Sequence, residues 1–264
     1  MTIHVWRAFS LATLVATLGV TGTAWALDGV CTVPLNFSDS QYANCFTDVR
    51  RGTDINDNNA LDLGGTGHTA LNFTGGAGPA GDLWLTTFSP HGTPVTFDVR
   101  NTICLSADVL IHTYNNTKGA GLVALLDSAP GGKGLAVILY DQGNSDSLQL
   151  ATIDPATGKL AKLKSVSLGA GIAENAWYHL DVSVTLIDFL GADILTVLAQ
   201  VSRHETPTDP NSPIAGPVGG LVFQDGVPND LGLEDSGEVG IAASGFSTNV
   251  NSSVTNWSVG VCIE

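Results

Sequence analysis

Several stretches of the chain alternate apolar and polar residues with the period of two that is typical of β-strands with one buried face. From Leu180 to Leu186 every second residue is Leu or Val, and the residues between them are Asp, Ser and Thr. Two other stretches, Gly121–Leu126 and Leu135–Leu139, are almost continuously apolar. Such runs are expected for central strands that are covered on both faces. The pattern therefore predicts a strand-rich chain with few helices.

Turn-forming residues separate these stretches at regular intervals. Asp127–Gly134, Asp141–Asp146 and Asp154–Gly158 combine Asp, Asn, Ser, Pro and Gly, which tolerate or preset turn conformations. Glycine is abundant, with 31 residues in the chain, and its pairs also favour loops over helices. A series of antiparallel hairpins in one all-β sandwich or barrel is the predicted architecture.

Two segments lack this regularity. The first, 27–95, is rich in Asn, Asp, Gly and Thr, and we expect it to wrap irregularly around one edge of the sheets. The second, 203–235, is expected to form a long loop excursion over the sandwich, because it is punctuated by Pro207, Pro210, Pro213, Pro217 and Pro228.

The first residues have the features of an export signal. Residues 1–26 contain Arg7, then an apolar run too short for a permanent membrane anchor, then the small-x-small sequence Ala24-Trp25-Ala26. We expect cleavage after Ala26 and a single mature domain over 27–264. The protein is accordingly expected outside the cell or at its surface, or in a periplasm if it is exported no further, without stable membrane insertion.

The charge balance excludes some partners. The formal net charge is −15, which would repel nucleic acid and anionic membrane surfaces. The acidity either only maintains solubility or includes loop carboxylates that hold Ca²⁺.

The four cysteines predict two disulfides, because their number is even and the chain carries an export signal. Three connectivities are possible. We favour Cys31–Cys45, which closes a short N-terminal loop, and Cys104–Cys262, which joins the final strand to an early one.

Between Thr96 and Cys262 the predicted strands carry two landmarks, a Trp-x-x-Leu-x-Val sequence at Trp177–Val182 and a Gly-x-Val-Gly sequence at Gly237–Gly240. Both lie in an ordered strand series: Ile103–Ile111, Gly121–Leu126, Gly134–Tyr140, Ser147–Ile153, Asn175–Val182, Ile194–Val201, Ser236–Ala242 and Val254–Val259. This series resembles the concanavalin A-like lectin/glucanase superfamily, especially its laminin-G-like members. The resemblance implies an all-β jelly-roll sandwich of two curved antiparallel sheets. It also implies that the first and last strands of the series are neighbours, which would place Cys104 opposite Cys262.

Catalytic motifs are missing from the sequence. Glucanases of that superfamily carry a Glu-x-Asp-x-x-Glu strand with paired carboxylates, and the chain has none; the acidic stretch Glu234–Glu238 has the wrong spacing. No two histidines are spaced as metal ligands, and we expect His179, beside Trp177, to have a packing or strand-face role. We therefore lean against an enzyme, with a glycan hydrolase of non-standard carboxylates as an alternative.

Calcium is the candidate cofactor. The segment from Asp54 has the Asp-x-Asn-x-Asn spacing of oxygen-ligand loops but departs from the EF-hand pattern at Asn59, where a turn glycine is usual. Ordinary turn chemistry is the alternative. The candidate ligands are Asp54, Asn56, Asn58 and Asp62.

Sugar binding usually needs an aromatic ring flanked by amides or carboxylates. The candidate sugar-binding residues are Trp84, Tyr114, Asn116, Tyr140, Asp141 and Asn144. The alternative is that the aromatic rings among them only cover sheet edges. The expected function is a non-catalytic module that binds a polysaccharide or glycoconjugate, with calcium as a candidate aid. A structural or adhesive surface subunit that self-associates is the other alternative.

Overall fold

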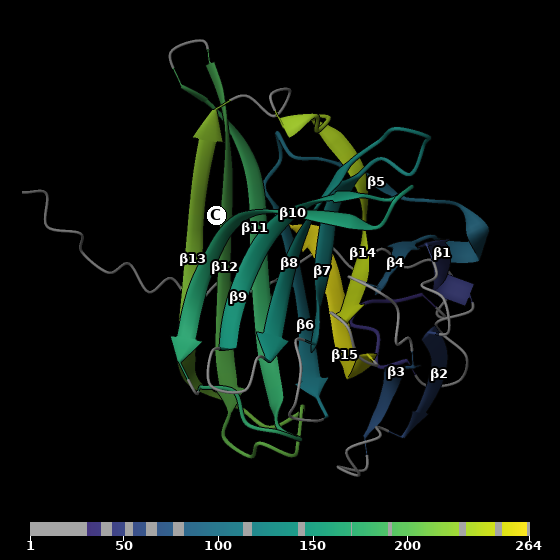
Figure 1. Ribbon diagram of the computed structural model, residues 1–264, viewed down its shortest axis with the longest axis vertical. Coiled ribbons are helices and arrows are strands. Elements are labelled where there is room, and N and C mark those ends of the chain that lie inside the picture. The colour runs from purple at the N-terminus through teal and green to yellow at the C-terminus, as the bar shows by residue number, and fades with distance from the viewer. Residues whose placement is uncertain are drawn as a thin grey trace, which may run out of the picture.

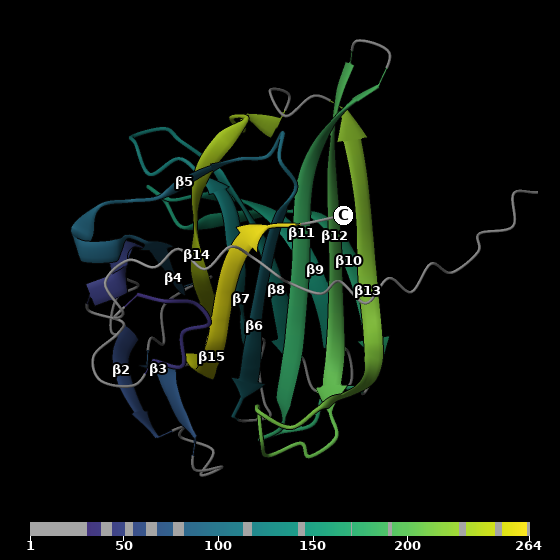
Figure 2. The ribbon, with the colours of Figure 1, turned by 180° about the vertical axis from the view of Figure 1, so that it is seen from behind.

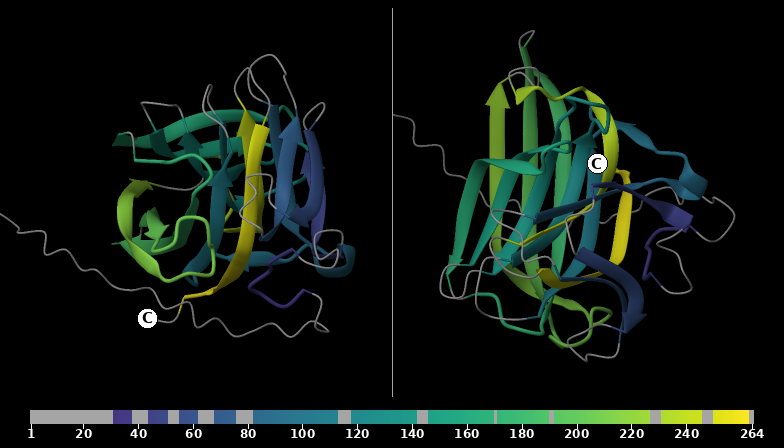
Figure 3. Two further views of the ribbon diagram at one scale, coloured as in Figure 1. Left: turned by 90° about the horizontal axis from the view of Figure 1, so that it is seen from below. Right: turned by 45° about the vertical axis from the view of Figure 1, so that its right-hand side comes forward.

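The computed structural model describes residues 31–37, 44–50, 55–61, 68–75, 82–112, 118–141, 146–169, 171–189, 192–226, 231–245 and 250–262. These residues form two antiparallel sheets that pack face to face, as the sequence predicted (Figure 1). Views from two further directions show the same two layers (Figure 3).

The first layer is an eight-stranded sheet in the order β1-β4-β14-β7-β8-β9-β10, with β5 added beside β14. Its strands are β1 (Phe46–Arg50), β4 (Asp82–Phe88), β5 (Thr96–Asp98), β7 (Lys118–Leu126), β8 (Gly134–Asp141), β9 (Asp146–Asp154), β10 (Lys159–Gly169) and β14 (Ser236–Gly245). One short 3-10 helix, η1 (Pro90–Gly92), follows β4.

The second layer is a seven-stranded sheet in the order β13-β12-β11-β6-β15-β3-β2. It faces the viewer in Figure 2, where β13, β12, β11, β6 and β15 lie side by side. Its strands are β2 (Ile55–Leu61), β3 (Thr69–Gly75), β6 (Ile103–Ile111), β11 (Trp177–Phe189), β12 (Ala192–His204), β13 (Ile214–Gly226) and β15 (Val250–Val261).

The alternation of side chains divides the seven-stranded sheet into a core face and an outer face. On β11, Leu180, Val182 and Val184 belong to the main core cluster. Because successive residues of a strand point to opposite faces, His179 and Asp181 lie on the outer face. The same alternation on β6 turns Ala107 and Val109 inward. Polar residues are therefore confined to one surface of this sheet, where the candidate site is found.

Aromatic rings fill the core between the layers. The Trp257 ring from β15 packs edge-on against Phe46, with ring centroids 5.0 Å apart, and lies 4.9 Å from Phe88. These rings come from both sheets, and each side chain is buried. Aromatic contacts of this kind add to the area that the core buries and fix how the layers sit on each other.

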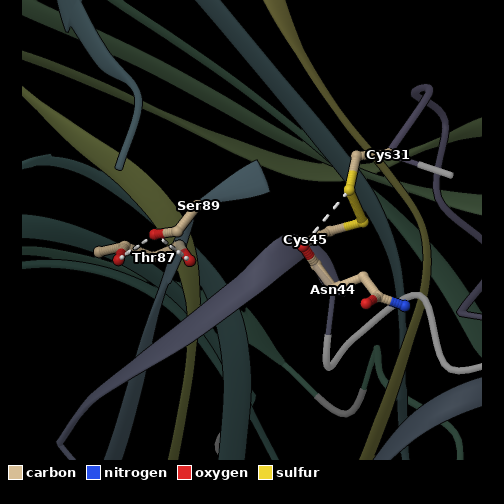
Figure 4. Close-up of a disulfide and its surroundings, with 5 residues drawn as sticks. All are labelled: Cys31, Asn44, Cys45, Thr87 and Ser89. Atoms are coloured by element: carbon tan, nitrogen blue, oxygen red, sulfur yellow. Dashed lines mark hydrogen bonds between the residues drawn. A yellow bond between two sulfur atoms is a disulfide. The ribbon is translucent and has the colours of Figure 1, made fainter. Parts of the chain in front are cut away.

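Both predicted disulfides are present. Cys31 and Cys45 are joined near the N-terminal end, where the Ser89 backbone N–H donates to the Cys45 carbonyl at 2.7 Å and so ties this loop to the end of β4 (Figure 4). Cys104 on β6 is joined to Cys262, just beyond β15. β6 and β15 are neighbouring strands, as the resemblance implied.

The two segments without alternation contain more regular structure than the sequence indicated. β1 to β4 lie within 27–95, and β13 lies within 203–235. β2 reads Ile-Asn-Asp-Asn-Asn-Ala-Leu, so its composition suggests a turn, yet it pairs with β3 along its whole length. β13 contains Pro217 and four glycines at an edge of the sheet, where a strand needs fewer backbone donors. In both cases pairing with a neighbouring strand outweighs the local preference.

Within the predicted excursion, residues 205–213 form a loop that joins β12 to β13 and is called the strap below, and the described residues 231–235 also lie outside the strands. The strap is closed on itself: Glu205 N–H donates to the Pro213 carbonyl at 2.8 Å, and Ser212 Oγ donates to the Asp209 carbonyl at 2.9 Å. It lies at the lower end of the seven-stranded sheet in Figure 2. Among the described residues, no helix is long and apolar enough to cross a membrane.

Removal of the disulfides tests how each one stabilises the fold. The Cys104–Cys262 bond closes a loop with a sequence separation of 158, whereas Cys31–Cys45 closes one of 14. In the chain-entropy account such bonds contribute about 3 kcal/mol for a loop of about 15 residues and about 5 kcal/mol above 100 residues. The Cys104→Ala/Cys262→Ala variant should lose more free energy of unfolding in urea than the Cys31→Ala/Cys45→Ala variant. Equal losses would contradict this expectation.

Candidate functional site

A cluster of two histidines and two aspartates occupies the outer face of the seven-stranded sheet, beside the strap. Asp108 on β6 is the register partner of His179 on β11. On the other side of β11, His179 pairs with Ser202 of β12, two residues before His204. Neighbouring strands therefore bring together side chains that are far apart in the sequence.

The carboxylate of Asp108 is the centre of the cluster. Its Oδ1 accepts hydrogen bonds from His179 Nδ1 and from His204 Nε2, each at 2.8 Å. Its Oδ2 accepts one from the Asn256 amide at 2.7 Å. The Asp108 side chain is only 3% exposed, and these three donors replace the water that it loses on folding.

Each histidine is also held on its other nitrogen. His179 Nε2 donates to Asp181 Oδ1 at 3.1 Å, and His204 Nδ1 donates to the Ser212 carbonyl of the strap at 2.8 Å. A carbonyl oxygen can only accept, so His204 Nδ1 carries a hydrogen. Both rings are thus fixed in orientation by two partners each.

The pKa values follow from this arrangement. Burial by itself would lower the pKa of His179, but hydrogen bonds and charge attraction from Asp108 and Asp181 outweigh it and raise that pKa to about 10. For His204, burial is likewise outweighed by Asp108, and its pKa is raised. Burial would raise the pKa of Asp108, yet the hydrogen bonds from both histidines lower it. In this arrangement the carboxylate is ionised between two imidazolium rings.

Asn256 connects the cluster to the strap. Its backbone is in the left-handed region with φ of 49°, at the point where the register between β15 and β6 shifts. Asparagine tolerates this conformation better than most residues, and the irregularity turns its amide toward Asp108. The same amide donates to the Pro210 carbonyl at 3.2 Å and to Asn211 Oδ1 at 3.3 Å.

The cluster opens to solvent on one side only. The side chains of Asp108 and His204 are each 3% exposed, whereas His179 is 18% and Asp181 is 26% exposed. A small ion or a polar group would therefore reach the cluster past His179 and Asp181.

A second polar network on this face has the residue types of a nucleophile and base but not their geometry. His112 Nε2 lies 2.6 Å from Ser253 Oγ. The single hydroxyl hydrogen of Ser253 is donated to Asn72 Oδ1, so the histidine must donate to the serine. A general base would have to accept that hydrogen. The network is thus a structural one in this conformation.

Two of the predicted sugar-stacking residues lie inside the protein. Trp84 is fully buried, packs edge-on against Phe73 at 4.7 Å and donates its indole N–H to Asp48 Oδ1 at 3.1 Å. Tyr140 is buried in a second apolar cluster of the eight-stranded sheet, and burial raises its pKa to about 12. Asp141 is buried beside it. None of these three side chains is at the surface in this conformation.

The other predicted site residues are largely outside the described part of the chain. Asn56 and Asn58 belong to strand β2, and nothing is established about their side chains. The residues outside the described ranges are Tyr114, Asn116, Asn144, Asp54 and Asp62. The calcium site stays a prediction.

Sequence reasoning missed the cluster, although one signal was present. It gave His179 a packing or strand-face role and found no ligand-spaced histidine pair, but the period-two pattern of β11 already places His179 and Asp181 together on the polar face. His204 and Asp108 reach them only through strand pairing, which spacing in the sequence does not reveal.

Comparisons with known proteins do not identify a family. No protein-family model matches the chain, and no curated protein matches it. Among solved structures, the carbohydrate recognition domain of Emp47p matches at 11% identity and a TM-score of 0.48, covering 89% of this chain and 96% of that one.

Two other solved structures show comparable similarity. A family 7 alginate lyase, A1-II', matches at 12% identity and a TM-score of 0.48, covering 88% of this chain and 99% of that one. A seed lectin of Lotus tetragonolobus matches at 12% identity and a TM-score of 0.43, covering 81% and 90%. At such low identity and TM-score these matches carry no argument about family, ligand or activity.

The pH dependence of stability tests the charged state of the cluster. His179 has a folded pKa of about 10, above its ordinary 6.5, so its contribution is complete below 6.5 and is lost as pH rises through 10. Asp108 has a lowered pKa, so its contribution is present above its ordinary 3.8 and is lost as pH falls. The cluster should stabilise the metal-free protein most between these two ordinary values.

Urea unfolding of chelator-treated wild type and His179→Gln at several pH values measures this effect. We expect the difference in unfolding free energy between them to shrink as pH rises from 6.5 toward 10. Gln200→Ala is the control, because it removes a neutral hydrogen bond to Ser202 on the same face. A His179→Gln difference that stays constant with pH would contradict the charged state.

Proposed function

We propose that the protein is a secreted, non-catalytic module that binds a neutral polysaccharide or glycoconjugate through the outer face of β11, β12 and β13. The observation that carries the proposal is the mixture of side chains on that face. A carboxylate, amides and hydroxyls surround a small exposed apolar pair, in a sheet whose other face is fully occupied by the core.

Strand register places these side chains next to one another. Asp181 on β11 pairs with Gln200 on β12, and on the same face Leu198 of β12 pairs with Val222 of β13. Leu198 is 41% and Val222 is 55% exposed, so both present an apolar surface to solvent. Gln200 is exposed as well.

This combination matches the chemistry of a sugar ring. A pyranose offers hydroxyl groups at its rim and C–H groups on its faces. The rim would hydrogen-bond to Asp181 and Gln200, and a C–H face would cover Leu198 and Val222. Binding sites generally combine apolar contact with a few placed polar groups in this way.

Charge and compartment are consistent with such a ligand. With a formal net charge of −15 the protein would repel a polyanionic glycan, which favours a neutral one. Two disulfides are compatible with an oxidising compartment, where extracellular glycans are met.

A structural or adhesive role is the second candidate, and the edge strand β13 favours it. Among the described strands β13 pairs only with β12, and Ile214 and Val222 on it are exposed. An unpaired edge of this kind is able to add a strand from another copy. Self-association of the purified protein in sedimentation experiments, without glycan binding, would support this role.

Glycan-array screening followed by calorimetry on the strongest neutral ligand tests the glycan proposal. We expect Gln200→Ala and Leu198→Ala each to weaken binding by about tenfold, because each removes one contact worth roughly 1–1.5 kcal/mol. Ile214→Ala is the matched control, because Ile214 is 48% exposed on β13 but lies near the strap end of the strand. The control should bind as the wild type does.

Three results would overturn the proposal. The first is silence of the folded protein across a broad array, and the second is unchanged affinity of both face variants. The third is release of sugar products during the assay, which would support the hydrolase alternative instead.

A further inference from the structure

The cluster around Asp108 has a property that the glycan proposal does not use. Asp108, His179 and His204 each offer one atom that could bind a metal, and these three atoms lie within 4.8 Å of one another. The ligand types, two imidazole nitrogens and one carboxylate oxygen, are those of transition-metal sites in proteins.

We propose that Asp108 Oδ1, His179 Nδ1 and His204 Nε2 form a binding site for one divalent transition-metal ion of the zinc class. The hydrogen-bonded cluster is the metal-free form of this site. The inference can be tested separately from glycan binding, because its three ligand atoms are not among the proposed sugar contacts and its readout is different.

The first support is the way in which both histidines are held from outside. Histidines that ligate metals almost always donate their other ring N–H to a carboxylate or a backbone carbonyl, which fixes the ring and its tautomer. His179 donates to the Asp181 carboxylate and His204 to the Ser212 carbonyl. With its hydrogen on Nδ1, the neutral His204 ring presents the Nε2 lone pair toward Asp108.

The second support is the orientation of the carboxylate. Asn256 donates to Asp108 Oδ2, which leaves Oδ1 to face the two rings. The Asn256 amide is itself positioned by the Pro210 carbonyl of the strap. Ligating carboxylates are commonly hydrogen-bonded in this manner, so each of the three ligands has a partner that fixes its direction.

The ligand set selects the ion. Zn²⁺ binds histidine nitrogen and carboxylate oxygen at about 2.0–2.2 Å, and sites with three protein ligands leave a fourth position for water or another group. Ca²⁺ requires six to eight oxygen ligands, and Mg²⁺ also prefers oxygen. Neither hard cation is expected here, which separates this site from the calcium loop predicted around Asp54.

Metal entry requires that His179 Nδ1 and His204 Nε2 release to solvent the protons that they donate to Asp108 Oδ1, and a small separation of the ligand atoms. Two ligand atoms of a tetrahedral zinc site lie about 3.3 Å apart, given bonds of about 2.0–2.1 Å. In the metal-free cluster Asp108 Oδ1 lies 2.8 Å from each ring nitrogen. Each of these two pairs would therefore separate by about half an ångström to admit the ion at such bond lengths. The exposed side at His179 and Asp181 provides the route.

A metal ion bound at this site would hold the strap more firmly against the sheet. The ligands come from β6, β11 and β12, and the strap is joined to them through Ser212 and through Asn256. The strap supplies no ligand, but a bound ion would hold the His204 ring in the orientation that donates to the Ser212 carbonyl of the strap and so strengthen that attachment. Metal should therefore slow hydrogen exchange in the strap specifically.

The test uses tag-free, chelator-treated full-length protein with Zn²⁺ and Co²⁺ as probes. Competition against a chromophoric chelator should give one zinc site per chain with micromolar or tighter affinity, and Ca²⁺ should not compete. Co²⁺ should give visible absorption bands of a four-coordinate site. Hydrogen exchange of residues 205–213 should slow on adding Zn²⁺.

Variants locate the site. His204→Gln and Asp108→Asn should abolish tight binding, whereas Asp181→Asn, which keeps all three ligands, should weaken it by about 10- to 100-fold. His91→Gln is the matched control, because it removes a histidine of η1, far from the cluster in the sequence, and it should bind as the wild type does. Because Asp181→Asn leaves all three ligands in place, it still tests the site if the variants that remove a ligand do not fold.

Two outcomes would overturn the inference. One is the absence of stoichiometric Zn²⁺ binding by the folded wild type at micromolar concentration. The other is binding that survives unchanged in His204→Gln and Asp181→Asn but is lost in His91→Gln.

Discussion

The carboxylate of Asp108 imposes the constraint on which this face of the protein depends. A charged oxygen pair that is almost fully buried destabilises a fold unless donors replace the lost water. Here the donors come from β11, β12 and β15, so the carboxylate is satisfied only when all four strands are in register. Other hydrogen bonds of His204 and Asn256 hold the strap through the Ser212 and Pro210 carbonyls, and the bonds to Asp108 direct one nitrogen of each histidine at its Oδ1.

The sandwich supplies the rigidity that this cluster requires. On β11 the residues that alternate with His179 and Asp181 are buried in the core, so the polar residues cannot turn inward without exposing leucine and valine. The Cys104–Cys262 bond joins β6 to the end of β15, the two strands that carry Asp108 and Asn256. Core packing on one face of the sheet therefore fixes the geometry of the site on the other.

Sequence reasoning recovered the scaffold more completely than the site. Every strand predicted between Ile103 and Val259 is present, and both favoured disulfides form. The strands β2 and β13 were missed because their asparagines, glycines and proline favour turns, and pairing with neighbours overrides that preference. Trp84 was a candidate for surface stacking, yet it is a core residue, since sequence alone does not tell which face of a sheet is covered.

The sequence by itself determined the all-β class and the alternation that separates core from surface. These properties depend on side-chain type and on spacing along one strand, which the chain displays directly. The tertiary structure decided that Asp108, His179, His204 and Asn256 meet. They are brought together by strand order, register and one irregularity at Asn256, and these result from pairing between strands that are distant in the sequence.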